Sequence, residues 1–321
     1  GGSGYGGGNT SLHGTSNGVY RNLMQRLAKG ITAASSREEI DVAFIVDTTQ
    51  SMEDNIRGVR AYMDDFVDLL TYDGRKPKFA LVTFRDAAQG RPKVRGFTSK
   101  SGDLRNWLHR TEFAGGGDLA ESGLDAVMAA VKELRFRRRA YRRFVFMGDG
   151  PFHDRDYDGQ SDYTLDEVIA ALRANSIAVD SVSLEHLPMQ QLAWGTGGRW
   201  IPIPGKGYLE HVPLALPVRS NAALGVLSTA SERASDEVYV FADPRHPSDW
   251  AELRWRILSP RGERIHGEFV ERADFDGSRV TFQPLFDPLW FRGSPGYYTV
   301  IYRVTDNRGR SSVLRRIIEY R

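Results

Sequence analysis

The sequence contains no cysteine among its 321 residues. Without thiols the chain can form no disulfide framework, no cysteine nucleophile and no thiolate metal site. It also lacks any run of about 18 or more apolar residues, the length that a membrane-spanning helix requires. Neither sign of charge is in excess, because 43 Lys and Arg stand against 41 Asp and Glu. This near balance creates no demand for nucleic acid or an anionic membrane as a partner.

The length of the chain is sufficient for two domains of ordinary size, each with its own core. Residues 1–37 begin with a glycine-rich run and predict a flexible lead that ends in a short helix. Such a run is typical of the segment that follows a processed export signal, including that of a lipoprotein with a lipid anchor upstream of Gly1. It is equally typical of an expression linker. We expect an extracytoplasmic location, in the periplasm or at the cell surface, with the cytoplasm as the alternative.

Apolar runs of strand length alternate with amphipathic helical segments over residues 38–203. The predicted strands are 40–46, 79–84, 93–97, 144–147, 177–184 and 200–203, and the predicted helices cover 56–70, 124–134, 165–172 and 189–193. This alternation predicts an α/β domain with a doubly wound, mostly parallel sheet covered on both faces. Ligands of such sheets bind at the carboxyl ends of the strands.

The pattern changes from residue 204 onward. Residues 204–220 are rich in proline and glycine and predict a linker. Short alternating runs follow at 237–241, 252–258, 264–270, 279–282, 297–304 and 313–318. They predict an all-β sandwich over residues 221–321. The run 296–309 resembles the last hairpin of immunoglobulin-like and PKD-like bacterial modules.

Three separate segments place oxygen-bearing side chains at the ends of predicted strands. Asp47, Thr49 and Ser51 follow the first strand, Asp149 follows the strand 144–147, and Asp118 comes after three glycines that allow close approach of the backbone. Each segment alone is also explained as a helix cap. Together, in order at strand ends, they favour one site for Mg²⁺, Mn²⁺ or Ca²⁺, which prefer such hard oxygen ligands.

These segments resemble the metal-ion-dependent site of von Willebrand factor A (vWA) domains, written D-x-S-x-S, then a Thr or Asp, then a distal Asp. Asp47, Thr49 and Ser51 match the first part, with Thr in place of the first Ser. Asp118 matches the second part in the Gly-Gly-Gly-Asp form of many bacterial members, and Asp149 matches the third. The runs 82–86 and 192–198 also resemble the corresponding segments of vWA domains. The resemblance covers residues 38–203.

The resemblance implies an ion with an open coordination position that an acidic residue of another protein completes. The expected function is metal-dependent protein recognition or adhesion in a bacterial surface or periplasmic assembly. Asp118 would place a second carboxylate beside Asp47, offset most of the charge of the ion and weaken its attraction for an external carboxylate. An intracellular scaffold with a mainly structural metal is therefore the alternative.

A second candidate metal segment lies just after Asp149. Its acids follow the opening of a calcium loop of the form D-x-D-x-D-G: Asp154, Asp156, Asp158 and, at the ninth position, Asp162. The acid expected at the twelfth position is missing, because that residue is Leu165. The segment predicts either a second Ca²⁺ or an ordinary solvated polar loop between a strand and a helix.

Two further features have plain explanations. The arginine-rich run 135–143 lies at the end of a predicted helix, where cations complement the helix dipole. The alternative is that this run binds an acidic protein partner. We expect no nucleic-acid partner. No G-x-S-x-G, H-E-x-x-H or phosphate-binding glycine loop is present, and we expect no enzyme. A metal-dependent hydrolase, with His153 as the base beside Asp149, is the remote alternative.

Overall fold

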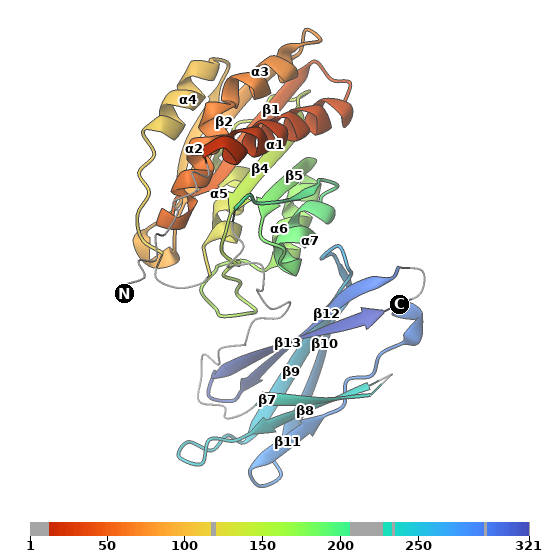
Figure 1. Ribbon diagram of the computed structural model, residues 1–321. Helices are drawn as coiled ribbons and strands as arrows, with labels where there is room; N and C mark the ends of the chain where they lie inside the picture. The colour runs from red at the N-terminus through yellow and green to blue at the C-terminus, as the bar shows by residue number, and fades with distance from the viewer. Residues whose placement is uncertain (1–12, 117–119, 206–226, 233–234, 292–293, 321) are drawn as a thin grey trace, which may run out of the picture.

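The computed structural model describes residues 13–116, 120–205, 227–232, 235–291 and 294–320. Figure 1 shows an α/β body above and an all-β body below. Each body has its own large hydrophobic core. This arrangement confirms the predicted fold class.

A six-stranded sheet forms the centre of the α/β body, in the order β3-β2-β1-β4-β5-β6. The strands are β1 (Glu39–Asp47), β2 (Lys76–Phe84), β3 (Lys93–Thr98), β4 (Tyr141–Gly148), β5 (Ile177–Ser183) and β6 (Trp200–Pro202). All neighbours pair in parallel except β2 and β3, which are antiparallel. The central strand β1 is buried from Ile40 to Asp47, as expected for a strand covered on both faces.

Helices cover both faces of this sheet (Figure 1). They are α1 (His13–Ala33), α2 (Glu53–Ala61), α3 (Met63–Thr71), α4 (Ser101–His109), α5 (Gly123–Glu133), α6 (Leu165–Ala174) and α7 (Leu187–Trp194). Short 3-10 helices occur at Gln50–Met52, Ala87–Gln89 and Pro288–Phe291.

The helices differ from the predicted ones in three places. The segment 56–70 is not one helix, because Tyr62 leaves the helical conformation (φ −119°, ψ 20°) and separates α2 from α3. The predicted short helix in the lead is instead α1, with 21 residues, and it buries Leu23, Leu27 and Ile31 in the core of the α/β body. The helix α4 was not predicted, since only Leu104 and Leu108 of its nine residues are buried.

Two antiparallel sheets form the all-β body, in the orders β10-β9-β12-β13 and β11-β8-β7. The strands are β7 (Leu227–Glu232), β8 (Ser235–Phe241), β9 (Trp250–Leu258), β10 (Arg264–Asp274), β11 (Arg279–Phe282), β12 (Gly296–Asp306) and β13 (Ser311–Tyr320). Trp255 lies at the centre of their core, against Phe269, Phe286 and Tyr302. The immunoglobulin-like assignment remains a prediction, as do the domain boundaries, because residues 206–226 of the linker region lie outside the described residues.

The all-β body contacts the α/β body beside α6 and α7 (Figure 1). Gln191 on α7 donates a hydrogen bond to the carbonyl of Ser259, and Arg261 donates to the carbonyl of Trp194. The connection between β4 and α6, residues 149–164, lies against strands of the all-β body through the ion pairs described below. The first residue of this connection is Asp149, so one segment connects the candidate metal site with the second body.

Candidate metal site

The first and third predicted segments meet at the carboxyl edge of the sheet. Asp47 is the last residue of β1 and Asp149 directly follows β4, and these two strands are parallel neighbours. Gly148 allows the close approach: a Cβ added there would lie 3.6 Å from the Asp47 Cβ and 3.1 Å from atoms of the Phe146 ring. A larger residue at position 148 would therefore press on the floor of the site.

A continuous chain of hydrogen bonds links four of the five predicted ligands. Asp47 Oδ1 accepts hydrogen bonds from the Thr49 backbone N–H and from Thr49 Oγ1, both at 2.8 Å. Thr49 Oγ1 lies 3.3 Å from Ser51 Oγ, which in turn donates to Asp149 Oδ1 at 3.0 Å. The structure thus gathers two carboxylates and two hydroxyls around one point.

The fifth predicted ligand, Asp118, lies outside the described residues. The loop that leads to it is described as far as Gly116 and begins against the first segment. The Ala114 N–H donates to the Thr48 carbonyl at 3.2 Å, and the Gln50 N–H donates to the Gly115 carbonyl at 3.3 Å. Gly115 and Gly116 have φ values of +80° and +104°, a backbone region that only glycine adopts without strain. This geometry agrees with the prediction from the sequence that these glycines allow the backbone to approach closely.

Burial leaves the carboxylate of Asp47 short of partners. Asp47 is 0% exposed, and its Oδ2 has no hydrogen-bond partner among the residues that the structure describes. Burial raises the pKa of Asp47 to about 7, the Thr49 backbone N–H opposes this rise, and the charge of nearby Asp149 adds to it. A divalent cation would supply the positive charge that this pair of acids lacks. The hard oxygen donors present therefore fit such an ion.

The site is open to solvent on one side. Asp47, Thr49 and Asp149 are buried, whereas Gln50 and Ser51 are exposed. The two acids thus form the floor, and the hydroxyl of Ser51 lies at the rim. A ligand could reach the site from the Ser51 side without movement of the core.

The predicted calcium segment has a different arrangement. Asp156 pairs with Arg256 at 2.5 Å and also with Arg303, and Asp154 pairs with Arg315 at 2.7 Å. Asp158 Oδ2 lies 2.5 Å from His153 Nδ1, and Asp162 is exposed. Within the described residues, no group of three or more His, Cys, Asp or Glu is arranged to hold a metal ion.

The prediction of a second Ca²⁺ at residues 154–162 therefore finds no support. Guanidinium groups from β9, β12 and β13 take up the carboxylates that a calcium ion would need. The alternative, a polar loop, describes the segment better, but the loop is not solvated: Asp154, Asp156 and Asp158 are all buried. Sequence reasoning missed Arg256, Arg303 and Arg315, because nothing local to them marks a pairing with acids 100 to 161 positions earlier in the chain.

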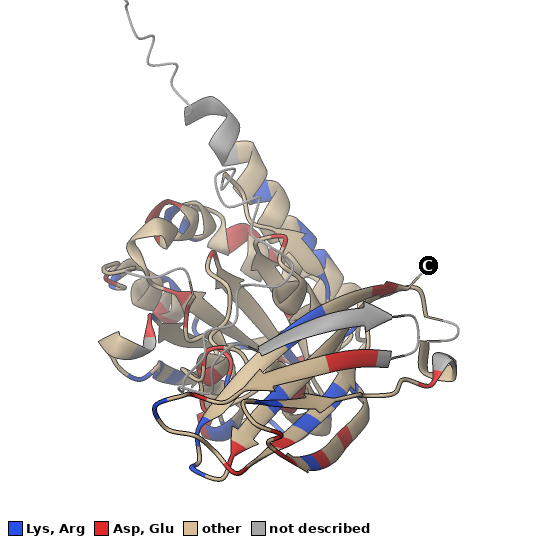
Figure 2. Ribbon diagram, turned by 90° about the horizontal axis from the view of Figure 1, so that it is seen from below, with Lys and Arg blue, Asp and Glu red and all other residues tan. Residues whose placement is uncertain are grey.

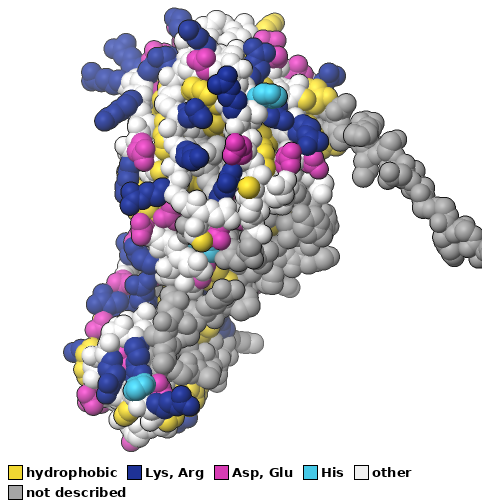
Figure 3. Space-filling view, turned by 90° about the vertical axis from the view of Figure 1, so that its left-hand side faces the viewer, with side chains coloured by type: hydrophobic (Ala, Val, Ile, Leu, Met, Phe, Trp, Pro, Cys, Tyr) yellow, Lys and Arg dark blue, Asp and Glu magenta, His cyan; other side chains and the backbone are white. Residues whose placement is uncertain are grey.

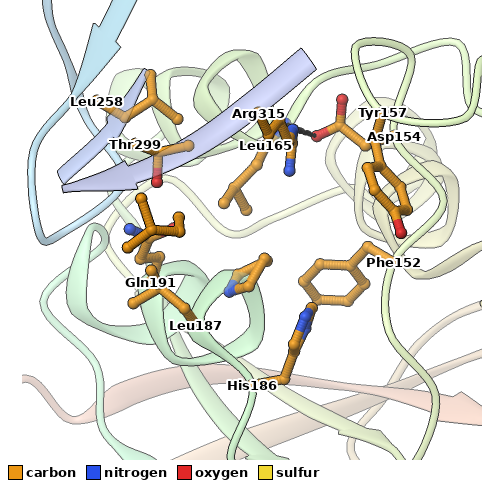
Figure 4. A pocket seen from close by; sticks show the side chains of 12 residues that line it. Phe152, Asp154, Tyr157, Leu165, His186, Leu187, Gln191, Leu258, Thr299 and Arg315 are labelled. Carbon is orange, nitrogen blue, oxygen red and sulfur yellow. Dashed lines mark hydrogen bonds and ion pairs between the residues drawn. The ribbon is translucent and has the colours of Figure 1, made fainter. Parts of the chain in front are cut away.

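A small, largely apolar cavity lies at the boundary between the two bodies. Figure 4 shows it lined from the α/β body by Phe152, His186 and Leu187 and from the all-β body by Thr299 and Arg315, with Arg315 joined to Asp154. Its volume of about 20 Å³ is room for roughly one water molecule. This cavity is therefore too small for a ligand, and two wider clefts, of about 470 Å³ and about 660 Å³, also lie between the two bodies.

His153, the residue considered as a base for metal-bound water, contacts acids outside the hydrogen-bonded set of the metal site. It is fully buried, with Nδ1 facing Asp158 and Nε2 lying 3.5 Å from Asp86 Oδ1. Asp86 follows β2, so this histidine connects the β2 end to the β4–α6 connection. The expectation that the chain is not an enzyme remains a prediction, and the geometry of His153 adds nothing to the hydrolase alternative.

A doubly wound sheet with an acid-and-hydroxyl site at its carboxyl edge defines a class of α/β binding domains. Within that class, residues 41–193 match the family model of the von Willebrand factor type A domain. This part of the chain is a vWA domain, as the sequence motifs predicted. None of the curated proteins has a sequence that matches the chain significantly.

Solved structures include similar chains. Proximal thread matrix protein 1 (PTMP1) from the mussel byssus is 17% identical, with a TM-score of 0.35, over 50% of this chain and 40% of that one. A form of the same protein with a zinc-occupied MIDAS motif is 19% identical, with a TM-score of 0.34, over 46% and 36%. BatB from Bacteroides thetaiotaomicron is 12% identical, with a TM-score of 0.37, over 53% and 93%. The match therefore spans less than half the length of the mussel protein.

The described part of the chain has no helix with the length and apolar character needed to cross a membrane.

Proposed function

We propose that the vWA domain binds one divalent cation, Mg²⁺, Mn²⁺ or Ca²⁺, and recognises another protein through it. The observation that carries this proposal is the hydrogen-bonded set Asp47–Thr49–Ser51–Asp149, which gathers two buried carboxylates and two hydroxyls around one point. Asp118 is the predicted fifth ligand. When bound, the ion offers an open coordination position to a carboxylate of the partner.

Some residues of the site would hold the ion, and others would present it to a partner. Thr49 fixes Asp47 Oδ1 through two hydrogen bonds, and among the described residues Oδ2 of that carboxylate has no hydrogen-bond partner. Ser51 connects Asp149 to the exposed rim, where a partner side chain would arrive. Because the floor is already ordered by hydrogen bonds, little conformational entropy is lost when the ligands close around an ion.

The setting of this recognition is a further part of the proposal. A bacterial surface or periplasmic assembly is the setting that the sequence predicts, and an intracellular scaffold with a structural metal is its alternative. The two differ in what the ion does. In the first, removal of the ion releases the partner; in the second, it lowers stability and leaves the partner bound.

Affinity capture from a native lysate tests the proposal. The wild-type protein in Mg²⁺ is expected to retain a partner that EDTA releases, and Asp47→Asn is expected to retain none in either condition. Asp162→Asn serves as the matched control, because it also removes one carboxylate but from an exposed position outside the site. Capture that survives both EDTA and Asp47→Asn would contradict metal-dependent recognition.

A further inference from the structure

A cleft with an excess of positive charge lies directly beside the candidate metal site. It is formed by the end of β2, the edge strand β3 and the segment after α4, and it has a volume of about 420 Å³. Its charged lining residues are Arg85, Arg91, Lys93, Arg95, Arg110 and a single acid, Glu112. Figure 3 views the molecule from the side on which α4 lies in Figure 1, and Lys and Arg side chains are spread over this face of the α/β body, with Asp and Glu among them.

Three of these five cations form no ion pair with any acid that the structure describes. Within the described ranges, Arg91, Lys93 and Arg110 are exposed and form no ion pair with a carboxylate. Arg95 is also exposed and lies over the ring of Trp107, at 5.8 Å from its centroid. At the boundary between the two bodies, in contrast, the buried arginines are paired with acids.

The edge strand β3 arranges two of these cations on one face. Lys93 and Arg95 are two residues apart and therefore lie on the same side of the strand. Lys93 is opposite Thr83 and Arg95 is opposite Leu81 on β2, and the other edge of β3 pairs with no strand in the described sheet. Arg85 forms the base of the cleft, where Nε donates to Thr48 Oγ1 and a second guanidinium nitrogen donates to the Glu112 carbonyl.

The cleft and the metal site share their wall. Thr48 lines the cleft and stands between Asp47 and Thr49 in the chain. Gln89 also lines the cleft and lies against Gly115, where an added Cβ would come within 2.1 Å of its side-chain nitrogen. An extended peptide advances about 3.3 Å per residue, so a segment with one carboxylate at the ion would enter the cleft within a few residues.

The chemistry of the lining favours an acidic protein segment over nucleic acid. Single-stranded nucleic acid binds through bases stacked on exposed aromatic rings. Phe84, the one aromatic residue that lines the cleft, is only 3% exposed. Exposed guanidinium and ammonium groups with threonine hydroxyls suit carboxylates instead.

We propose that this cleft binds the acidic residues that neighbour the metal-coordinating carboxylate in the partner protein. The inference rests on the proposed function for the identity of the partner. Its electrostatic contribution, however, does not need the ion. The cleft would select partners with Asp- or Glu-rich segments and speed their approach to the metal site.

Fluorescence anisotropy with a labelled ten-residue glutamate peptide tests the inference. The cleft variant combines Arg91→Glu, Lys93→Glu and Arg95→Glu. The matched control combines Arg26→Glu, Lys29→Glu and Arg245→Glu, three exposed cations elsewhere that change the net charge equally. We expect the cleft variant to weaken binding by roughly tenfold or more in both Mg²⁺ and EDTA, and the control by less than about threefold.

The other possible results either contradict the binding of acidic segments in the cleft or distinguish it from the proposed metal-dependent recognition. If the cleft variant and the control bind the peptide equally, the cleft is not the site. The proposed function would still stand if Asp47→Asn weakened binding in Mg²⁺. If a ten-nucleotide thymidine strand displaces the peptide at lower concentration than unlabelled peptide does, the cleft is a nucleic-acid site. Should the glutamate variant fail to fold, the glutamine version of the same three positions replaces it, with the same expected direction.

Discussion

Buried acids on the two halves of one connection are neutralised in different ways. At the start of the β4–α6 connection, Asp149 lies near Asp47, and Asp47 forms no ion pair with a cation among the described residues. This pair is called the metal pair below. Further along, Asp154 and Asp156 meet arginines of the all-β body, as does Asp166 at the start of α6. These three are called the arginine-paired acids.

The comparison shows that an acidic pattern alone does not define a metal site. Asp154 and Asp156 belong to the segment that resembles a calcium loop, yet guanidinium groups bind their oxygens, as Figure 4 shows for Asp154 and Arg315. Figure 2 shows acidic and basic segments lying together where the all-β body crosses the α/β body. A buried carboxylate is costly unless it is paired. The arginines therefore offset the cost of burying the arginine-paired acids. For the metal pair, a bound cation would offset this cost.

Among the substitutions that test this comparison, removal of Arg256 is expected to lower the free energy of unfolding the most. Its guanidinium contacts both Asp156 and Asp166, and it is almost fully buried. Burial alone lowers the pKa of Arg256, but Asp166 and Asp156 outweigh that effect and hold it above its usual value. Arg256→Met would leave two buried acids without their main partner. We expect a loss of about 3–5 kcal/mol in the free energy of unfolding, measured by urea denaturation.

The control for this variant is Arg254→Met on the same strand. Arg254 is exposed and pairs only with Glu252 and Glu268 at the surface. Pairs of this kind contribute little, so the variant should unfold almost as the wild type does. Equal destabilisation by both substitutions would show that the buried ion pairs do not hold the two bodies together.

Asp47 of the metal pair predicts a dependence of stability on pH. The pKa of Asp47 rises to about 7 in the folded protein, above its value of 3.8 in a model compound. The folded state then holds a proton that the unfolded state has released, so stability without metal falls as pH increases from about 4 to 7. Asp47→Asn removes this titration. In EDTA, the wild type should lose roughly 2–3 kcal/mol relative to the variant between pH 5 and pH 8.

Urea denaturation at the two pH values measures this difference. Asn at position 47 retains an oxygen that accepts from Thr49, and its amide can donate toward Asp149, so the variant should fold. Parallel pH profiles for the wild type and Asp47→Asn would contradict the prediction, since they would mean that Asp47 is ionised at no cost.

Arg315 is expected to have a smaller effect than Arg256. It donates to Asp154 at 2.7 Å and to the Asp156 carbonyl at 3.2 Å, and it lies over the ring of Tyr157. Asp154 keeps two backbone donors, from Asp156 and Leu165, when the arginine is removed. Arg315→Met should therefore cost about 1–3 kcal/mol, with the same denaturation experiment as the measurement. A loss as large as that of Arg256→Met would mean that the backbone donors do not support Asp154.

The smallest effect is expected at Asp162. This residue occupies the ninth position of the calcium-like segment but is exposed. Asp162→Asn should leave the melting temperature unchanged in both Ca²⁺ and EDTA, because the other acids of the segment are already paired. A melting temperature that rises with Ca²⁺ in the wild type and not in this variant would restore the second calcium site.

The sequence predicted the sheet, and it also singled out the segments of Asp47 and Asp149 that the structure brings together, because both features are marked locally. Buried strands such as β1 are almost wholly apolar, and Asp47, Thr49 and Ser51 alternate directly after that strand. The strand β7 was missed because its sequence is small and polar, with only Leu227 as a large apolar residue. The pairing of Arg256 with Asp166 could not be predicted, because it depends on how the two bodies dock and their residues are 90 positions apart.

Calorimetric titration of the full chain with Mg²⁺, Mn²⁺ and Ca²⁺ tests the central claim most directly. The account predicts a single-site isotherm for the wild type, its loss in Asp47→Asn, and its retention in Asp162→Asn. A second, independent set of sites would contradict the assignment of the arginine-paired acids. An isotherm that is unchanged in Asp47→Asn would contradict the metal site itself.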